Sequence, residues 1–316
     1  MEKRTDLALE VRESFPEDDV EISGVILEEE TYLDGRIRKS TVEIKNEQGQ
    51  RQMNKPIGNY ITLEFTDRGK YDDPEEREKT RRTAAAMIAQ VIEKLAPEKG
   101  EVYLAAGLGN RFATPDALGP FVLDDVMVNR HIKKHFQDLY PEGKRTFCAV
   151  TPGVMGQTGM ETREILGGVI QSVKPCCLLV VDSLASRSIN RLCSTIQITD
   201  TGICPGAGIG NNRNTLNEKE LKVPVIAIGV PTVVDAYTIV SECMEKSLVQ
   251  EGYTAEQIEL FLRSFANESM GELFVTPKDI DEQIRDIGKL VAEGINLFVK
   301  GEYKLSHIKA CNQEND

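Results

Sequence analysis

Three aspartates lie close after short apolar runs, where carboxylates could carry out acid–base chemistry. Asp116, Asp182 and Asp235 each follow a run that is typical of a β-strand. In open α/β sheets, ligands bind beyond the carboxyl ends of the strands, so Asp116 and Asp182 could meet at one edge of a sheet. Two neighbouring carboxylates repel each other, which raises the pKa of one and leaves the other ionised. The sequence therefore indicates a pair that could act as general acid and general base.

Structural roles for the aspartates compete with this interpretation. A carboxylate just before a helix often caps the N-terminus of that helix. Spacing alone supports this alternative equally well for Asp116 and Asp182, and favours it for Asp235, which directly precedes an expected helix. Asp200 begins the Asp-Thr-Gly tripeptide of pepsin-like proteases. Those enzymes are all-β, whereas this tripeptide lies within an α/β pattern, so we expect no catalytic role for Asp200.

Other catalytic chemistries have weaker support. The chain has only three histidines. His131 and His135 are four residues apart but lack the glutamate of zinc-peptidase helices, so we expect an exposed helix face and no metal site. No Gly-x-Ser-x-Gly motif is present, although Cys204 in a Gly-Pro loop stays open as a nucleophile. Gly107 and Gly109 lack the third glycine of the dinucleotide fingerprint, and we expect no cofactor.

Composition and charge exclude several functional classes. The 316 residues include 40% hydrophobic and 28% charged side chains, which is typical of a folded globular chain. The formal net charge of -13 predicts no electrostatic attraction to nucleic acid. Seven cysteines without Cys-x-x-Cys spacing favour a reduced intracellular compartment. Apolar runs stay far below the ~18 residues of a membrane span, and no apolar leader is present, so we expect neither membrane insertion nor export.

The elements that must position the aspartates follow from the spacing of apolar residues. Alternating apolar and polar residues early in the chain predict a β-meander, and later strands alternate with helices. The expected fold class is α/β, with a mostly parallel central sheet, helices on both faces and an N-terminal β-meander elaboration. Strands are predicted at 20–27, 37–45, 59–65, 102–107, 147–150, 177–182 and 225–229, and helices at 75–95, 121–136, 161–173, 236–249, 255–267 and 278–299.

Five long motifs extend in order over nearly the whole chain. They occupy residues 107–120, 152–162, 182–188, 202–211 and 225–236, among them Gly-Leu-Gly-Asn, Thr-Pro-Asp-Ala-Leu-Gly-Pro and Pro-Gly-Val-Met-Gly-Gln-Thr-Gly. Together, and in register, these motifs resemble the germination protease family of spore-forming bacteria. The resemblance implies a fold related to hydrogenase maturation proteases. It also implies an endopeptidase that initiates degradation of small acid-soluble spore proteins during germination, in the cytoplasm of the forespore and in the spore core. A homotetramer that contacts neither DNA nor membrane is expected.

The resemblance places the two essential aspartates of the family on Asp116 and Asp182. Loops 107–120, 152–162 and 202–213 would hold an extended substrate, with glycines allowing close backbone approach and arginines binding an acidic residue at the cleavage site. The predicted substrate-binding residues are Gly107, Gly109, Asn110, Gly153, Arg187 and Arg213.

The N-terminus carries a further motif. Residues 5–10, Thr-Asp-Leu-Ala-Leu-Glu, resemble the Thr-Glu-(Phe or Ile)-Ala-Ser-Glu sequence at which the family cuts its substrates. The resemblance implies a zymogen that cuts itself between Asp6 and Leu7, although such a short pattern is also common where helices begin. The chain would then divide into a propeptide (1–6), a β-rich N-terminal elaboration (7–72) and an α/β peptidase core (73–316).

Two other functions stay open. A metal-dependent processing protease of the hydrogenase-maturation type would need a third ligand, but no histidine follows the strand predicted at 225–229. A non-catalytic nucleotide-binding module would need better glycine patterns than the chain offers.

Overall fold

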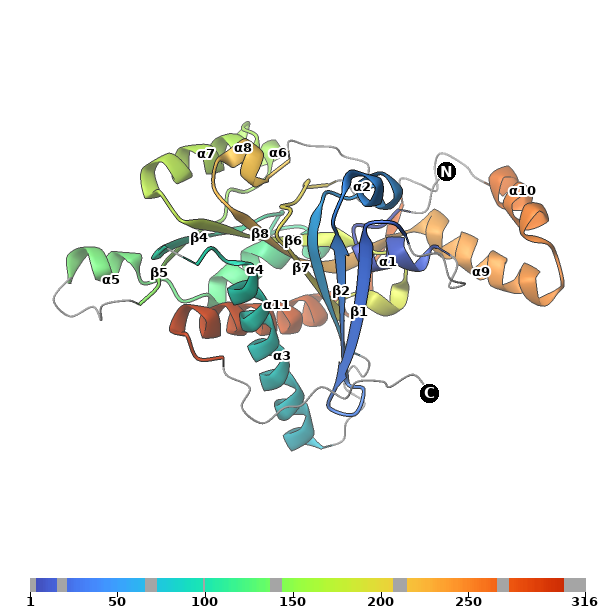
Figure 1. Ribbon diagram of the computed structural model, residues 1–316, viewed down its shortest axis with the longest axis horizontal. Helices are drawn as coiled ribbons and strands as arrows, with labels where there is room; N and C mark the ends of the chain where they lie inside the picture. The colour runs from blue at the N-terminus through green and yellow to red at the C-terminus, as the bar shows by residue number, and fades with distance from the viewer. Residues whose placement is uncertain are drawn as a thin grey trace.

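A mixed β-sheet organises the chain (Figure 1). The structure is a computed structural model, and it describes residues 4–15, 22–65, 73–98, 100–136, 144–206, 215–265 and 273–303. The strands are β1 (Val25–Tyr32), β2 (Ile37–Ile44), β3 (Gly58–Phe65), β4 (Val102–Gly107), β5 (Thr146–Val150), β6 (Cys177–Ala185), β7 (Thr195–Thr199), β8 (Val225–Asp235) and β9 (Phe274–Val275).

The strand order is β1-β2-β3-β7-β8-β6-β4-β5, with β9 added to β8. Strands β5, β4, β6 and β8 pair in parallel, and β1, β2, β3 and β7 pair antiparallel. The α/β fold class and the N-terminal meander of β1 to β3 are thus confirmed. The meander is continuous with the core sheet, because β3 pairs with β7 and places Leu63 opposite Ile196.

Helices cover both faces of the sheet, as predicted (Figure 1). On one face lie α3 (Pro74–Leu95), α4 (Leu118–Asp125) and α11 (Ile280–Lys300), and on the other lie α7 (Thr162–Val173) and α8 (Glu218–Leu221). The remaining helices are α1 (Ala8–Glu13), α2 (Glu47–Met53), α5 (Arg130–His135), α6 (Met155–Thr158), α9 (Ala236–Gln250) and α10 (Ala255–Phe265), with 3₁₀ turns η1 (Thr114–Asp116) and η3 (Ile189–Arg191).

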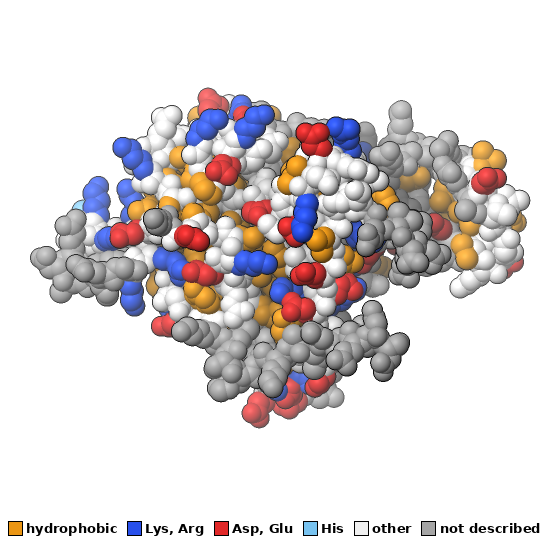
Figure 2. Space-filling model, viewed as in Figure 1, with side chains coloured by type: hydrophobic (Ala, Val, Ile, Leu, Met, Phe, Trp, Pro, Cys, Tyr) orange, Lys and Arg blue, Asp and Glu red, His pale blue; other side chains and the backbone are white. Residues whose placement is uncertain are grey.

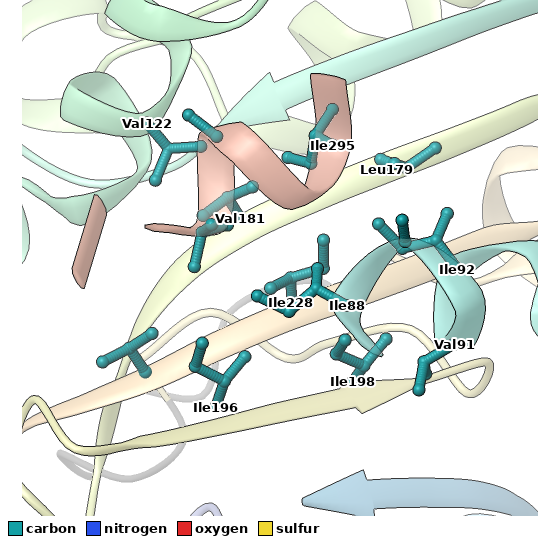
Figure 3. Packing of buried hydrophobic residues seen from close by; sticks show 14 of the residues in the cluster. Ile88, Val91, Ile92, Val122, Leu179, Val181, Ile196, Ile198, Ile228 and Ile295 are labelled. Atoms are coloured by element: carbon teal, nitrogen blue, oxygen red, sulfur yellow. The ribbon is translucent and has the colours of Figure 1, made fainter. Parts of the chain in front are cut away.

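The main hydrophobic core lies between the sheet and helices α3, α4 and α11. Figure 3 shows Ile88 of α3, Ile228 of β8 and Ile295 of α11 among the buried side chains of this core. These three side chains have at most 1% of their surface exposed. Helix α3 begins where Asp73 accepts a hydrogen bond from the Glu75 N–H, with proline at the first helical position.

The bounds of the strand predicted at 20–27 are wrong. Strand β1 begins at Val25 and continues through three glutamates, which the apolar alternation did not favour. As an edge strand it pairs on one side only, and Arg38 and Lys39 of β2 form ion pairs with Glu29 and Glu30. Charges of this kind are compatible with an edge strand and discourage further pairing.

Two other predicted elements are also corrected. The single helix expected at 121–136 is two helices, α4 and α5, because the Asn129 side chain between them bonds the backbone of the β5 strand, accepting from the Phe147 N–H at 2.6 Å. The segment between the strands predicted at 37–45 and 59–65, where no helix was expected, contains helix α2, which Asn46 caps by accepting from the Gly49 N–H at 2.9 Å.

Charged side chains are distributed over the surface. On the face drawn in Figure 2, Lys and Arg side chains are interspersed with Asp and Glu and form no single basic patch. Within the described parts of the chain, none of the helices is long and apolar enough to cross a membrane.

Candidate active site

Asp182 lies inside strand β6. The strand continues past it to Ala185, so the prediction that the strand ends at Asp182 is wrong. Asp182 pairs in parallel register with Gly229 of β8, and its side chain accepts the Ser183 N–H at 2.9 Å. Only 5% of Asp182 is exposed. It caps no helix, so the structural alternative does not account for this carboxylate.

Asp116 ends the η1 turn that follows strand β4. Its carboxylate accepts the Asn110 N–H at 2.9 Å, which folds the loop back on itself. Gly109 makes this possible: its φ is +103°, and a Cβ there would lie 1.9 Å from the Asp116 carbonyl oxygen. Thr232 of β8 holds the same turn by donating to the Pro115 carbonyl at 2.6 Å. The loop therefore fixes the half-buried Asp116 against the sheet.

A cavity of about 360 Å³ is lined by both aspartates. Gly109, Gly153 and Cys204 also line it. The structure thus brings the sequence-selected aspartates, 66 positions apart, to one site, together with two of the predicted substrate-binding glycines.

The other predicted substrate-binding residues lie elsewhere. Gly107 packs against α4, where a Cβ would lie 2.4 Å from the Gly119 carbonyl oxygen. Asn110 stabilises the loop, because its side-chain oxygen accepts from Phe112 and Gln157, each at 3.1 Å. The guanidinium of Arg187 lies 3.5 Å from Glu242 and lines a different hollow. Arg213 lies outside the described residues.

Asp235 and Asp200 have structural roles. Asp235 caps α9 by accepting from the backbone and side chain of Thr238 at 2.9 and 2.5 Å. Asp200 accepts from the backbone and side chain of Asn59 at 2.8 and 2.7 Å and so joins the ends of β3 and β7.

The N-terminal segment reaches the same cavity. Asp6 lines it and extends along the end of β6: its N–H donates to the Ala185 carbonyl at 2.9 Å, and its carboxylate accepts the Ala185 N–H at 2.8 Å. Leu7, Ala8 and Leu9 that follow are fully buried. The peptide bond at which self-cleavage is predicted is therefore docked three residues along β6 from Asp182.

Side chains that the sequence analysis missed hold this segment. The Asp6 carbonyl accepts from Lys55 Nζ at 3.0 Å and from Gln197 Nε2 at 3.3 Å, and Gln197 Oε1 accepts the Ala8 N–H at 2.7 Å. Burial lowers the pKa of Lys55, against the raising effect of the Asp6 and Glu10 carboxylates. A signal was present for Gln197, which is a polar residue between isoleucines in a strand; none distinguished Lys55.

Glu10 anchors the other end of the segment. It has no exposed surface and accepts from Ser186 Oγ at 2.7 Å and from the N–H groups of Arg187 and Ser188 at 2.7 and 3.1 Å. Thr5 Oγ1 also donates to it, and Arg191 lies 3.3 Å away. These donors compensate for the loss of water around a buried carboxylate.

The described part of the chain contains no group of three or more His, Cys, Asp or Glu side chains that could hold a metal ion. His131 and His135 are exposed on α5, as expected.

Comparisons with known proteins agree with the motifs. The family described as germination protease matches residues 2–271. The germination protease of Clostridium tetani is 41% identical over 327 residues, covering 98% of this chain and 99% of that protein. That of Caldanaerobacter subterraneus is 42% identical over 314 residues and covers 94% of each chain. That of Bacillus cytotoxicus is 36% identical over 342 residues, covering 93% of this chain and 92% of that protein.

A comparison of structures found a nickel-iron hydrogenase maturation protease from Thermococcus kodakarensis, 16% identical, with a TM-score of 0.32 over 65% of this chain and 98% of that one. The family match spans most of the chain, and the relatives align over nearly their full length. This chain is a peptidase that belongs to the germination protease family.

Proposed function

We propose that the chain is an aspartic-type endopeptidase that initiates degradation of small acid-soluble spore proteins in the germinating spore. It is made as a zymogen that cuts itself between Asp6 and Leu7. The observation that carries the proposal is that Asp6, which precedes the peptide bond to be cut, lines the same cavity as Asp116 and Asp182. Residues 5–10 resemble the substrate sequence of the family, so the docked segment serves as a guide to how substrates bind.

The two carboxylates divide the chemistry. One accepts a proton from the attacking water, and the other, protonated, donates a proton to the departing nitrogen. The acidic side chain before the cut is held by the backbone N–H of Ala185, and the glutamate four residues after the cut is held by Ser186 and its neighbours. A homotetramer in the forespore and spore core belongs to the same proposal.

Self-cleavage of the purified full-length chain tests the proposal. Intact-mass spectrometry would follow the loss of residues 1–6 in the wild type, in Asp116→Asn and Asp182→Asn, and in the control Asp286→Asn, an exposed aspartate of α11. We expect the wild type and the control to be cut and both active-site variants to stay intact while folded. A peptide containing Thr-Glu-Phe-Ala-Ser-Glu, given to the form that starts at Leu7, should be cut after its first Glu.

Two outcomes would change the proposal. Cleavage that stops with a chelator and returns with a divalent ion would favour the metal-dependent alternative. If no folded form of the chain cuts itself or the peptide, the proposed function is wrong. Light scattering of the same samples measures the oligomer.

A further inference from the structure

Two side chains converge on one backbone carbonyl at the peptide bond proposed to be cut. Lys55 Nζ and Gln197 Nε2 both donate to the Asp6 oxygen, at 3.0 and 3.3 Å. About two-thirds of the hydrogen bonds in a folded chain join backbone groups to each other. The Asp6 oxygen instead accepts from two side-chain donors, one of them an ammonium.

The orientation of the Gln197 amide follows from its second contact. Its oxygen accepts the Ala8 N–H at 2.7 Å, and a backbone N–H can bond only to the oxygen of the amide. The NH₂ group therefore faces the Asp6 carbonyl. Gln197 lies in the middle of β7 with 6% exposed, and its strand pairs with β3 and β8 on both sides. The donor is thus held on a rigid element.

Lys55 approaches the same oxygen from the segment between α2 and β3. The residue is half-buried, and the protein atoms around its ammonium lower its pKa. A desolvated cation gains little electrostatic interaction energy from a neutral carbonyl in the resting state. It gains much more when the oxygen becomes negatively charged, since charge–charge interactions are stronger where water is excluded.

The donors and the carboxylates reach Asp6 from different cavities. The cavity of about 360 Å³ holds Asp116 and Asp182, and a second one of about 240 Å³ is lined by Lys55 and Gln197; Asp6 lines both. The water-activating groups and the oxygen-binding groups therefore have separate access to the same residue.

We propose that Lys55 and Gln197 form the oxyanion-binding site of this peptidase, a role that rests on the proposed cleavage between Asp6 and Leu7. The water oxygen forms a bond to the Asp6 carbonyl carbon while one aspartate takes a proton from the water, and the carbonyl electron pair moves onto the oxygen bound by Lys55 and Gln197. When the carbonyl re-forms, the C–N bond breaks, and the other aspartate protonates the Leu7 nitrogen. The bonds of 3.0 and 3.3 Å shorten as the oxygen gains charge.

Two variants remove the donors separately. Lys55→Met removes the ammonium but keeps an unbranched side chain. Gln197→Glu keeps an acceptor for the Ala8 N–H and removes the N–H that reaches Asp6. Lys45→Met is the matched control, because Lys45 is a half-exposed lysine of the same region, paired with Glu43. Rates of self-cleavage are measured by intact mass, and docking of residues 5–13 by hydrogen exchange.

We expect each donor variant to cut itself about 100-fold more slowly or worse, as when an oxyanion donor is removed elsewhere. Residues 5–13 should stay protected, and Lys45→Met should cut at the wild-type rate. A wild-type rate in Lys55→Met overturns the proposal. So does a slow rate with lost protection of residues 5–13, because Lys55 would then only position the segment. If the wild type itself leaves the Asp6–Leu7 bond intact, the proposed function fails, and this proposal with it.

Discussion

At the scale of single residues, the site combines charges whose effects on activity and on stability oppose each other. Lys55 binds the Asp6 carbonyl, yet burial lowers the pKa of its ammonium. Because the folded pKa lies below the unfolded one, the folded chain binds fewer protons in the window between them. The charged form of Lys55 therefore destabilises the fold most below the folded pKa, and this effect disappears as pH rises toward the ordinary lysine value.

We expect Lys55→Met to raise the free energy of unfolding at neutral pH while it slows cleavage. This gain in stability should shrink as pH rises from the folded pKa of Lys55 toward the ordinary lysine pKa. Asp6 and Glu10 are the carboxylates that face Lys55. Denaturant unfolding of the two proteins between about pH 7 and pH 10 measures this difference. A gain that stays constant with pH would mean that the folded chain does not lower this pKa.

Glu10 offers a second test at this scale. Its carboxylate accepts from Ser186, Arg187 and Ser188 with no exposed surface, so Glu10→Ala leaves the donors in place without an acceptor. Unsatisfied buried donors cost about 1–3 kcal/mol each. We expect residues 5–13 to lose protection in hydrogen exchange and self-cleavage to slow about tenfold or more. Unchanged protection would show that Glu10 does not anchor the segment.

Cys204 lines both cavities and was left open as a nucleophile. A thiol nucleophile needs a base beside it, and among the described residues that line the larger cavity none is a histidine. We expect Cys204→Ser to change the rate of self-cleavage by less than about tenfold, measured beside Asp182→Asn. A loss as large as that of Asp182→Asn would make Cys204 the nucleophile.

The sequence indicated the aspartates but not their partners. Asp116 and Asp182 could be selected because each follows an apolar run, which is a local signal. Lys55 and Gln197 come from distant segments and meet Asp6 only after β3, β7 and the N-terminal segment are assembled. No spacing in the sequence encodes that meeting, so the contacts of these two residues with Asp6 could not be predicted.

At the scale of elements, helices α3 and α11 pack closely against each other. Helix α11 crosses α3 at Gly294, where a Cβ would lie 2.5 Å from Ile88 Cγ2 and 2.6 Å from its Cβ. No side chain fits there without moving the backbone of one helix, because a Cβ has no alternative rotamer. By contrast, a Cβ on Gly167 of α7 would meet nothing within 4 Å.

These two glycines form a matched pair for stability measurements. Gly294→Ala should lower the free energy of unfolding by about 1–3 kcal/mol through overpacking. Gly167→Ala should raise it by about 1 kcal/mol, because alanine restricts the unfolded chain and favours the helix. Urea unfolding of both variants against wild type gives the two signs. Equal effects would mean that the α3–α11 contact can open without cost.

Element boundaries were predictable where periodicity was strong and failed where tertiary contacts decide. Helix α3 and strand β4 lie within a residue of the predicted bounds, because their apolar spacing is regular. Asn129 breaks the predicted helix at 121–136 by bonding to β5, and β8 runs to Asp235 because β6 and β9 pair with its later residues. Contacts of this kind appear only after the sheet has formed.

At the scale of the whole molecule, the N-terminal meander and the core form one sheet. Strand β3 pairs with β7 from Tyr60 to Glu64, and Asp200 closes the end of this pairing through Asn59. The proposed division at residue 72 therefore marks a change in strand pattern and not a separate sheet.

A cooperative sheet predicts cooperative unfolding. We expect hydrogen exchange under rising denaturant to release β2 and α3 at the same free energy, within about 1 kcal/mol, because opening β3 removes the partner of β7. Asp200→Ala should lower both together. Release of the meander at a much lower denaturant concentration than α3 would show two units that unfold independently.

The burial of Leu7 makes the proposed cut a one-way step. An intact peptide bond is neutral, and this one lies where Leu7 has no exposed surface and Lys55 is 3.0 Å from the neighbouring oxygen. Cleavage would leave a carboxylate on Asp6 and an ammonium on Leu7 at the same buried position, from which water is excluded. Burying a charge without water or a partner costs free energy. The new Asp6 carboxylate would keep Lys55 and Gln197 as partners, whereas the new Leu7 ammonium would lie buried near a second cation. The Leu7 end would therefore leave its buried position after the cut, and the two ends would not rejoin.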